Sequence, residues 1–114
     1  AIANKSGAFI VPSVAAVTAA AAGAAASLPP TTDYRVSIVN APGADAYPIS
    51  SFTWILIYQH QTDAAKKKKL VDFMTWAYDE GEKDAPTLDY APLPAELLPR
   101  VKTQLAKIDI GAQR

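Results

Sequence analysis

Residues 47–58 read YPISSFTWILIY, and this stretch bears most directly on the fold of the 114-residue chain. Pro48 fixes the backbone angle φ at the entry. The run from Thr53 to Tyr58 is almost wholly apolar and is rich in β-branched and aromatic side chains. Such a run is typical of a strand that is covered on both faces. We therefore expect a buried strand here, within an α/β fold.

Before this stretch, the sequence predicts a short extended piece at residues 7–11 that Pro12 ends, followed by a helix. Ser13 is a good N-cap for an alanine-rich helix over residues 14–26. Residues 35–39 alternate between polar and apolar and indicate a half-buried strand, with Val36 and Ile38 on its inner face.

After this stretch, the spacing of apolar residues predicts two helices. Asp63 should cap the first helix, whose apolar stripe is Leu70, Phe73, Met74, Ala77 and Tyr78. The second helix should begin near residues 94–96, with an irregular first turn at Pro99. Its expected inner face is Leu97, Val101, Leu105 and Ile108. The tail after Ile110 is expected to fray.

Length, composition and charge limit the class of protein. The chain is long enough for one domain, and half of its residues are hydrophobic, which favours a folded core. Eleven basic and 11 acidic residues balance to a formal net charge of zero, which argues against nucleic acid as a partner. The run Lys66–Lys69 fits the solvated face of a helix start better than a polyanion-binding patch.

The sequence shows no catalytic constellation, cofactor motif or metal motif. It has no cysteine and one histidine, so zinc thiolate sites and two-histidine sites are ruled out. His60 is expected to be an exposed turn residue. No Gly-rich phosphate loop and no G-x-S-x-G elbow occurs, and the carboxylates of residues 79–84 crowd one helix end. We therefore expect a protein that is not an enzyme and needs no cofactor.

Ser50 and Ser51 lie at the entry of the predicted strand and allow two interpretations. Hydroxyl groups can donate hydrogen bonds to an oxyanion. They can equally satisfy backbone groups where the chain bends, and we favour this second interpretation because no arginine is near in sequence.

Several phrases together carry a family resemblance. They are AYPISSFTWILIY at residues 46–58, KLVDF at 69–73 with WA at 76–77, Gly81, and LDYAPLP at 88–94. NKSG at residues 4–7 and Pro12-Ser13 with the alanine-rich helix add to them. The chain resembles the C-terminal part of periplasmic phosphate-binding proteins, the solute receptors of the high-affinity phosphate ABC transporter.

The resemblance implies a two-lobed α/β fold of the type II periplasmic binding proteins, of which this chain is the C-terminal portion, incomplete without the N-terminal portion. Residues 1–46 would be a segment of the second lobe. Residues 47–114 would supply the inter-lobe return strand and the C-terminal helices that complete the first lobe, with Tyr47-Pro48 near the hinge. Apolar surface on Trp54, Ile55, Phe73 and Tyr78 would then lack partners within the chain.

The resemblance also implies the function. The expected ligand is inorganic phosphate, and the expected partners are the N-terminal portion of the receptor, possibly as a separate chain, and the transporter's permease subunits. The expected place is periplasmic or extracellular, membrane-associated through the transporter. The family's phosphate ligands lie outside this chain, so Ser50 and Ser51 are expected at most to line the cleft near the hinge. A non-transport interaction or signalling module, or a phosphatase, on the same scaffold stays open as an alternative.

Overall fold

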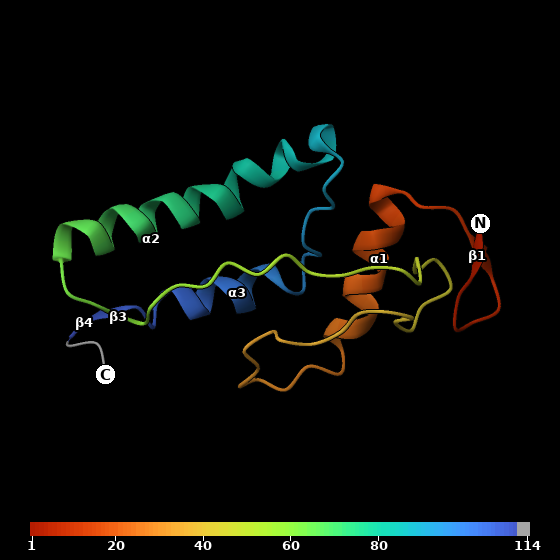
Figure 1. Ribbon diagram of the computed structural model, residues 1–114, viewed down its shortest axis with the longest axis horizontal. Helices are drawn as coiled ribbons and strands as arrows, with labels where there is room; N and C mark the ends of the chain where they lie inside the picture. The colour runs from red at the N-terminus through yellow and green to blue at the C-terminus, as the bar shows by residue number, and fades with distance from the viewer. Residues whose placement is uncertain (112–114) are drawn as a thin grey trace.

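Two groups of elements lie end to end along the chain in the computed structural model, which describes residues 1–111 (Figure 1). Its extents are 50 × 29 × 19 Å. One end holds helix α1 and the N-terminal hairpin, and the other holds helices α2 and α3. Residues 112–114, which include most of the tail expected to fray and the end of the segment 47–114, lie outside the described part of the chain.

The chain opens with a hairpin and a helix. Strand β1 (Ile2–Ala3) pairs antiparallel with β2 (Phe9–Ile10), so the expected extended piece is the second strand of a hairpin. Helix α1 spans Val14–Ala25. Its predicted N-cap is confirmed, because the Ser13 hydroxyl oxygen accepts a hydrogen bond from the Ala16 N–H at 3.1 Å.

The core of the molecule lies around α1 and is built from small side chains. Four alanines of the helix are buried there with residues from the loop that follows and with one residue from far along the chain: Ala20, Ala21, Ala24, Ala25, Ile38, Ala41, Ala46 and Leu97. Because alanine is small, the loop can approach the helix closely. At Gly23, an added Cβ would stand 1.7 Å from the carbonyl oxygen of Pro42.

Asn4 ties the hairpin to this loop. Its side chain is buried, and its Nδ2 donates to the carbonyl oxygens of Gly43, Ala44 and Ala46 at 2.7–3.2 Å. Its Oδ1 accepts hydrogen bonds from the N–H groups of residues 6 and 8. A buried amide whose hydrogen-bonding capacity is used in this way fixes one arrangement of the two segments.

The predicted strand at residues 35–39 does not form, although its pattern of burial is as expected. Ile38 is buried and Val36 half-buried, while Arg35, Ser37 and Val39 are exposed. A strand also needs a neighbouring backbone, and none of residues 1–111 pairs with this segment. The alternation of polar and apolar residues therefore arises from packing against α1 and not from membership of a β-sheet.

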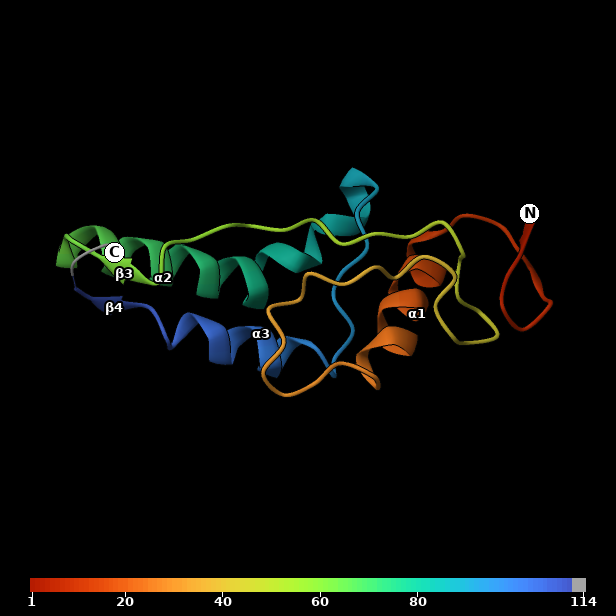
Figure 2. The same cartoon turned by 60° about the horizontal axis from the view of Figure 1, so that its bottom comes forward.

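The strand predicted at residues 53–58 is also absent as a paired and buried element. The segment is extended and runs from the α1 end of the molecule to β3 in both views (Figures 1 and 2), but it belongs to no sheet within residues 1–111. Most of its side chains are exposed, Leu56 to 89%. The expectation of burial is wrong for this chain taken alone, because nothing in its described part covers the segment.

The second group of elements follows. Strand β3 (His60–Gln61) pairs parallel with β4 (Asp109–Ile110), and α2 spans Ala64–Asp79. The short 3₁₀ helices η1 (Gly81–Lys83) and η2 (Ala85–Leu88) lead towards α3 (Leu98–Leu105). Asp63 caps α2 as predicted, because its carboxylate accepts from the N–H groups of Ala65 and Lys66.

The two helices bear out most of the predicted faces. Met74 is buried, but Phe73 of the same predicted stripe is 59% exposed. Pro99 lies in the first turn of α3, where the missing N–H removes no helical hydrogen bond. It is therefore compatible with α3, which begins at Leu98 and not near residues 94–96 as expected, because residues 95–97 form an irregular turn before the helix.

Candidate functional site

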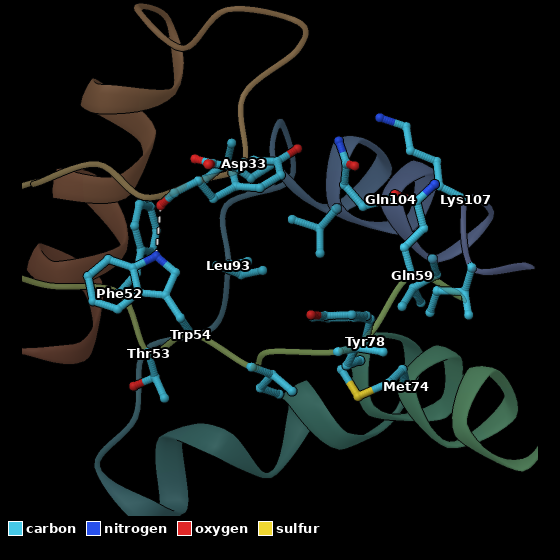
Figure 3. A pocket seen from close by; sticks show the side chains of 17 residues that line it. Asp33, Phe52, Thr53, Trp54, Gln59, Met74, Tyr78, Leu93, Gln104 and Lys107 are labelled. Atoms are coloured by element: carbon cyan, nitrogen blue, oxygen red, sulfur yellow. Dashed lines mark hydrogen bonds between the residues drawn. The ribbon is translucent and has the colours of Figure 1, made fainter. Parts of the chain in front are cut away.

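A cavity of about 320 Å³ separates the extended segment from helices α2 and α3 (Figure 3). Ile55 and Ile57 of the segment line it, as do Met74 and Tyr78 of α2 and Val101 of α3. Its polar side chains include Gln59, Gln104 and Lys107, which Figure 3 shows on the side away from Trp54. A mainly apolar lining of this kind suits hydrophobic packing.

The backbone of the extended segment is open on both edges. Within the described residues, no N–H group of residues 52–58 donates a hydrogen bond, and no carbonyl of residues 53–57 accepts one. Only after Gln59, where β3 meets β4, does pairing begin, with the Asp109 N–H donating to the Gln59 carbonyl at 2.9 Å. Unpaired strand edges are the usual template for adding another strand.

Several large apolar side chains of the segment are exposed, namely Trp54, Leu56 and Tyr58. The indole Nε1–H of Trp54 donates to the carbonyl oxygen of Tyr34 at 2.7 Å, a bond drawn in Figure 3. This bond holds one side chain in place, while the segment as a whole presents an apolar face and free backbone groups.

Ser50 and Ser51 lie in a second, wider groove of about 630 Å³, between the start of α1 and the region of Tyr90. Ser50 is buried and its hydroxyl donates to the Tyr47 carbonyl at 2.8 Å. The exposed Ser51 hydroxyl donates to the Phe52 carbonyl at 3.2 Å. Both serines therefore satisfy backbone groups, which is the interpretation that the sequence favoured.

The charge of this groove does not suit an anion. Its described lining includes Glu82 and Asp89 and contains no Lys or Arg. Burial raises the pKa of Glu82, and the hydrogen bond from the Leu93 N–H and the nearby charge of Lys102 partly oppose this effect. Phosphate recognition usually uses cationic side chains as well as backbone N–H donors, and the described lining of the groove supplies no cationic side chain.

Tyr78 lies between the cavity and the groove and lines both. Burial raises the pKa of its phenol, and the negative charge of Glu82 and the proximity of Tyr34 add to the increase. The phenol therefore stays neutral at physiological pH and can act as a packing residue with a polar end.

Arg100 is a key residue that the sequence reasoning missed. Its guanidinium donates to the carbonyl oxygens of Ala25, Leu28 and Pro29 at 2.9–3.1 Å, just where α1 ends. Helix C-termini leave carbonyls unsatisfied and carry a partial negative charge, so a cation is favourable there. The available signal was that α1 lacks both a basic residue in its last turn and a glycine after it.

His60 is half-buried in β3, not exposed in a turn, and its Nδ1 lies 2.5 Å from the Asp109 carboxylate. Within residues 1–111, no group of three His, Asp or Glu side chains could hold a metal ion. None of the helices in this part of the chain has the length and hydrophobicity to cross a membrane.

The geometry thus defines a segment of a mixed α/β protein with an unfilled packing surface, and comparison with known proteins agrees with it. The chain is 35% identical to the phosphate-binding protein PstS of Xylella fastidiosa (strain 9a5c) over 106 residues, 93% of the chain and 29% of that protein. It is 33% identical to the PstS protein of Pasteurella multocida over 89% of the chain and 29% of that protein. The PstS protein of Methanocaldococcus jannaschii is 36% identical over 73% of the chain and 23% of its own length.

These matches confirm the family resemblance: the chain is homologous to part of the phosphate-binding proteins. It spans less than a third of the length of these relatives, which are named as binding proteins and not as enzymes. No family model matches the chain.

Proposed function

We propose that this chain forms part of the extracytoplasmic receptor of a phosphate ABC transporter and completes the scaffold that binds inorganic phosphate. The observation that carries the proposal is the open segment at residues 52–58, apolar on its side chains and unpaired on both backbone edges. Its natural complement is a sheet contributed by the portion of the relatives that this chain does not span.

The proposed roles of the two parts of the chain follow from this scaffold. Residues 1–46 would belong to the second lobe, and residues 47–114 would return to the first lobe and complete it, with Tyr47-Pro48 near the hinge. The buried Pro48, whose carbonyl accepts from the Asn40 N–H at 2.8 Å, supports a defined crossing point there.

Phosphate would be held mainly by residues of the remaining portion, without being turned over. The acidic lining of the groove and the occupied hydroxyls of Ser50 and Ser51 support this division. The two serines would line the cleft near the hinge. In the cell, the receptor would work outside the cytoplasmic membrane and deliver phosphate to the permease subunits.

Calorimetry with inorganic phosphate tests the proposal. The 114-residue chain would be titrated alone, and then as a fusion to the N-terminal portion of the Xylella fastidiosa relative. We expect binding heat only from the fusion. Heat from another ligand but none from phosphate would overturn the proposed ligand, and binding by the chain alone would overturn the division of roles.

A further inference from the structure

Two side chains from residues 47–114 hold both ends of the loop that follows α1. At its far end, the Trp54 indole N–H donates to the Tyr34 carbonyl at 2.7 Å (Figure 3). At its near end, the Arg100 guanidinium donates at 2.9–3.1 Å to three backbone carbonyls, those of Ala25, Leu28 and Pro29. We name residues 25–34 the clasped loop.

All four hydrogen bonds cross between the two lobes of the proposed receptor. Arg100 and Trp54 belong to residues 47–114, whereas the clasped loop belongs to residues 1–46. The inference drawn from these bonds therefore rests on the proposed function. Because hydrogen bonds are directional and weaken steeply as the donor and acceptor separate, the four bonds fix one orientation of the two lobes.

The clasped loop lies away from the point where the chain crosses between the lobes. At the crossing, the Tyr47 N–H donates at 3.0 Å to the carbonyl of Ala16, in the first turn of α1. The clasped loop begins at Ala25, roughly 14 Å further along the same helix. A rotation of about 15° around an axis through the crossing and across the helix would move this end by roughly 4 Å. Such a movement breaks the bonds of Arg100 and Trp54.

The backbone at the far end of the clasped loop is strained. Tyr34 has a φ of 63°, in the left-handed region that a tyrosine rarely adopts. Its N–H donates to the hydroxyl of the buried Thr32 at 3.0 Å, and its carbonyl accepts the bond from Trp54. Strained residues persist where their surroundings fix them, and they cluster at switch regions. Loss of the Trp54 bond would remove one of the contacts that fix Tyr34.

The four bonds are made while the proposed cleft is open. The groove beside Ser50 and Ser51 measures about 630 Å³, and residues of the first half of α1 line it together with Tyr90. A rotation of the lobes that narrows this groove changes the orientation that the bonds of Arg100 and Trp54 require. The contacts of the clasped loop therefore favour the open arrangement.

We propose that Arg100 and Trp54 form a latch that holds the receptor open until phosphate binds. Leu97 also crosses between the lobes, but its contact with the alanines of α1 is apolar and non-directional, so the surfaces can slide. The hydrogen bonds of the latch have to break when the lobes close. Part of the free energy of phosphate binding is then used to open the latch, which raises the apparent Kd.

The latch is tested by measuring phosphate affinity in the fusion to the N-terminal portion of the Xylella fastidiosa relative. Arg100→Ala should lower the Kd about five-fold, and Trp54→Phe about three-fold, because the open form loses hydrogen bonds. Arg100→Lys keeps the charge but cannot reach all three carbonyls, so it should lower the Kd about two-fold. Arg100→Ala should at the same time lower the urea midpoint. A purely structural role would lower the midpoint without tightening binding, so an unchanged or higher Kd would overturn the latch.

Lys69→Ala is the matched control for charge, because Lys69 is exposed on α2 and makes none of the latch contacts. Phosphate is an anion, so loss of a positive charge alone should raise the Kd or leave it unchanged. A fall in Kd for Lys69→Ala equal to that for Arg100→Ala would overturn the latch.

Small-angle X-ray scattering without phosphate separates this inference from the proposed function. If the unsubstituted fusion binds no phosphate, the proposed ligand is wrong, but the latch can still be tested. The fusion that carries both Arg100→Ala and Trp54→Phe should then have a smaller radius of gyration than the unsubstituted fusion, because its lobes close more often. Equal radii in that case would overturn the latch.

Discussion

In the core around α1 the apolar side chains are mostly small and are covered, whereas in residues 52–58 they are mostly large and open. The alanines of α1 pack against their own following loop and against Leu97, so this region is closed within the chain. The extended segment exposes large apolar side chains and has no backbone partner on either edge among residues 1–111. In this chain, the segment of large apolar residues thus marks the surface that needs a partner. The small residues mark the region that packs within the chain.

The largest expected difference between the two regions is in the free energy of unfolding when one leucine in each is replaced by alanine. Leu97→Ala removes a side chain that is only 1% exposed in the α1 core and should lower the free energy of unfolding by about 3 kcal/mol. Leu56→Ala, at 89% exposure, should change it by less than about 0.5 kcal/mol. Urea denaturation followed by tryptophan fluorescence measures both.

The same two leucine variants give a second test when the N-terminal portion of a relative is fused to the chain. In the fusion to the N-terminal portion of a relative, Leu56→Ala should become costly, by about 2 kcal/mol, because the sheet then covers that side chain. If Leu56→Ala stays silent in the fusion, the segment is not part of a buried sheet.

Gly23→Ala tests how closely the loop at Pro42 approaches helix α1. The added Cβ would stand 1.7 Å from the Pro42 carbonyl oxygen, so the loop must move. We expect a loss of about 2 kcal/mol in the free energy of unfolding. Gly81→Ala is the matched control, because its Cβ would meet nothing nearer than 3.5 Å; an equal effect from both variants would refute the close approach.

Arg100 links the two regions, and its removal should have a moderate effect. Arg100→Ala removes the guanidinium donor from three carbonyls at the end of α1, of which those of Ala25 and Pro29 keep a backbone donor, and should cost about 1.5 kcal/mol. Arg100→Lys keeps the charge but cannot reach all three acceptors, so it should recover only part of the loss. Full recovery by lysine would show that charge alone matters.

The smallest effect concerns pH. Burial raises the pKa of Glu82 above its ordinary value of 4.5, so the folded chain holds this proton more tightly than the unfolded chain. The free energy of unfolding therefore falls as pH rises from about 4.5 through the raised pKa. Glu82→Gln keeps an acceptor for the Leu93 N–H and removes this dependence, so the difference between urea midpoints at about pH 4 and about pH 8 should shrink. An unchanged difference would contradict the effect of burial.

The sequence predicted the local features well because their causes are local. Both helix caps, Ser13 and Asp63, and the inner positions Ile38 and Leu97 are where periodicity and cap chemistry placed them. The two predicted strands failed because a strand is defined by its neighbours, and these are not among the described residues. Long-range contacts such as Arg100 with the end of α1, 71 to 75 residues apart, leave no periodic trace in a sequence.

In the candidate site, too, local features were predicted from the sequence and long-range ones were not. The sequence correctly favoured backbone bonds for Ser50 and Ser51, because hydroxyls at a bend find carbonyls nearby. It could not place the cavity, which forms only when the extended segment, α2 and α3 come together. The role of the two serines in lining a phosphate cleft stays a prediction.

Amide hydrogen exchange of residues 52–58 tests the central claim most directly. In the 114-residue chain alone, these N–H groups should exchange at close to unprotected rates, while those of α1 are protected. In the fusion to the N-terminal portion of a relative, the same groups should become protected as strongly as the rest of a buried sheet. Protection in the chain alone, or its absence in the fusion, would contradict the claim that this segment is a strand awaiting its sheet.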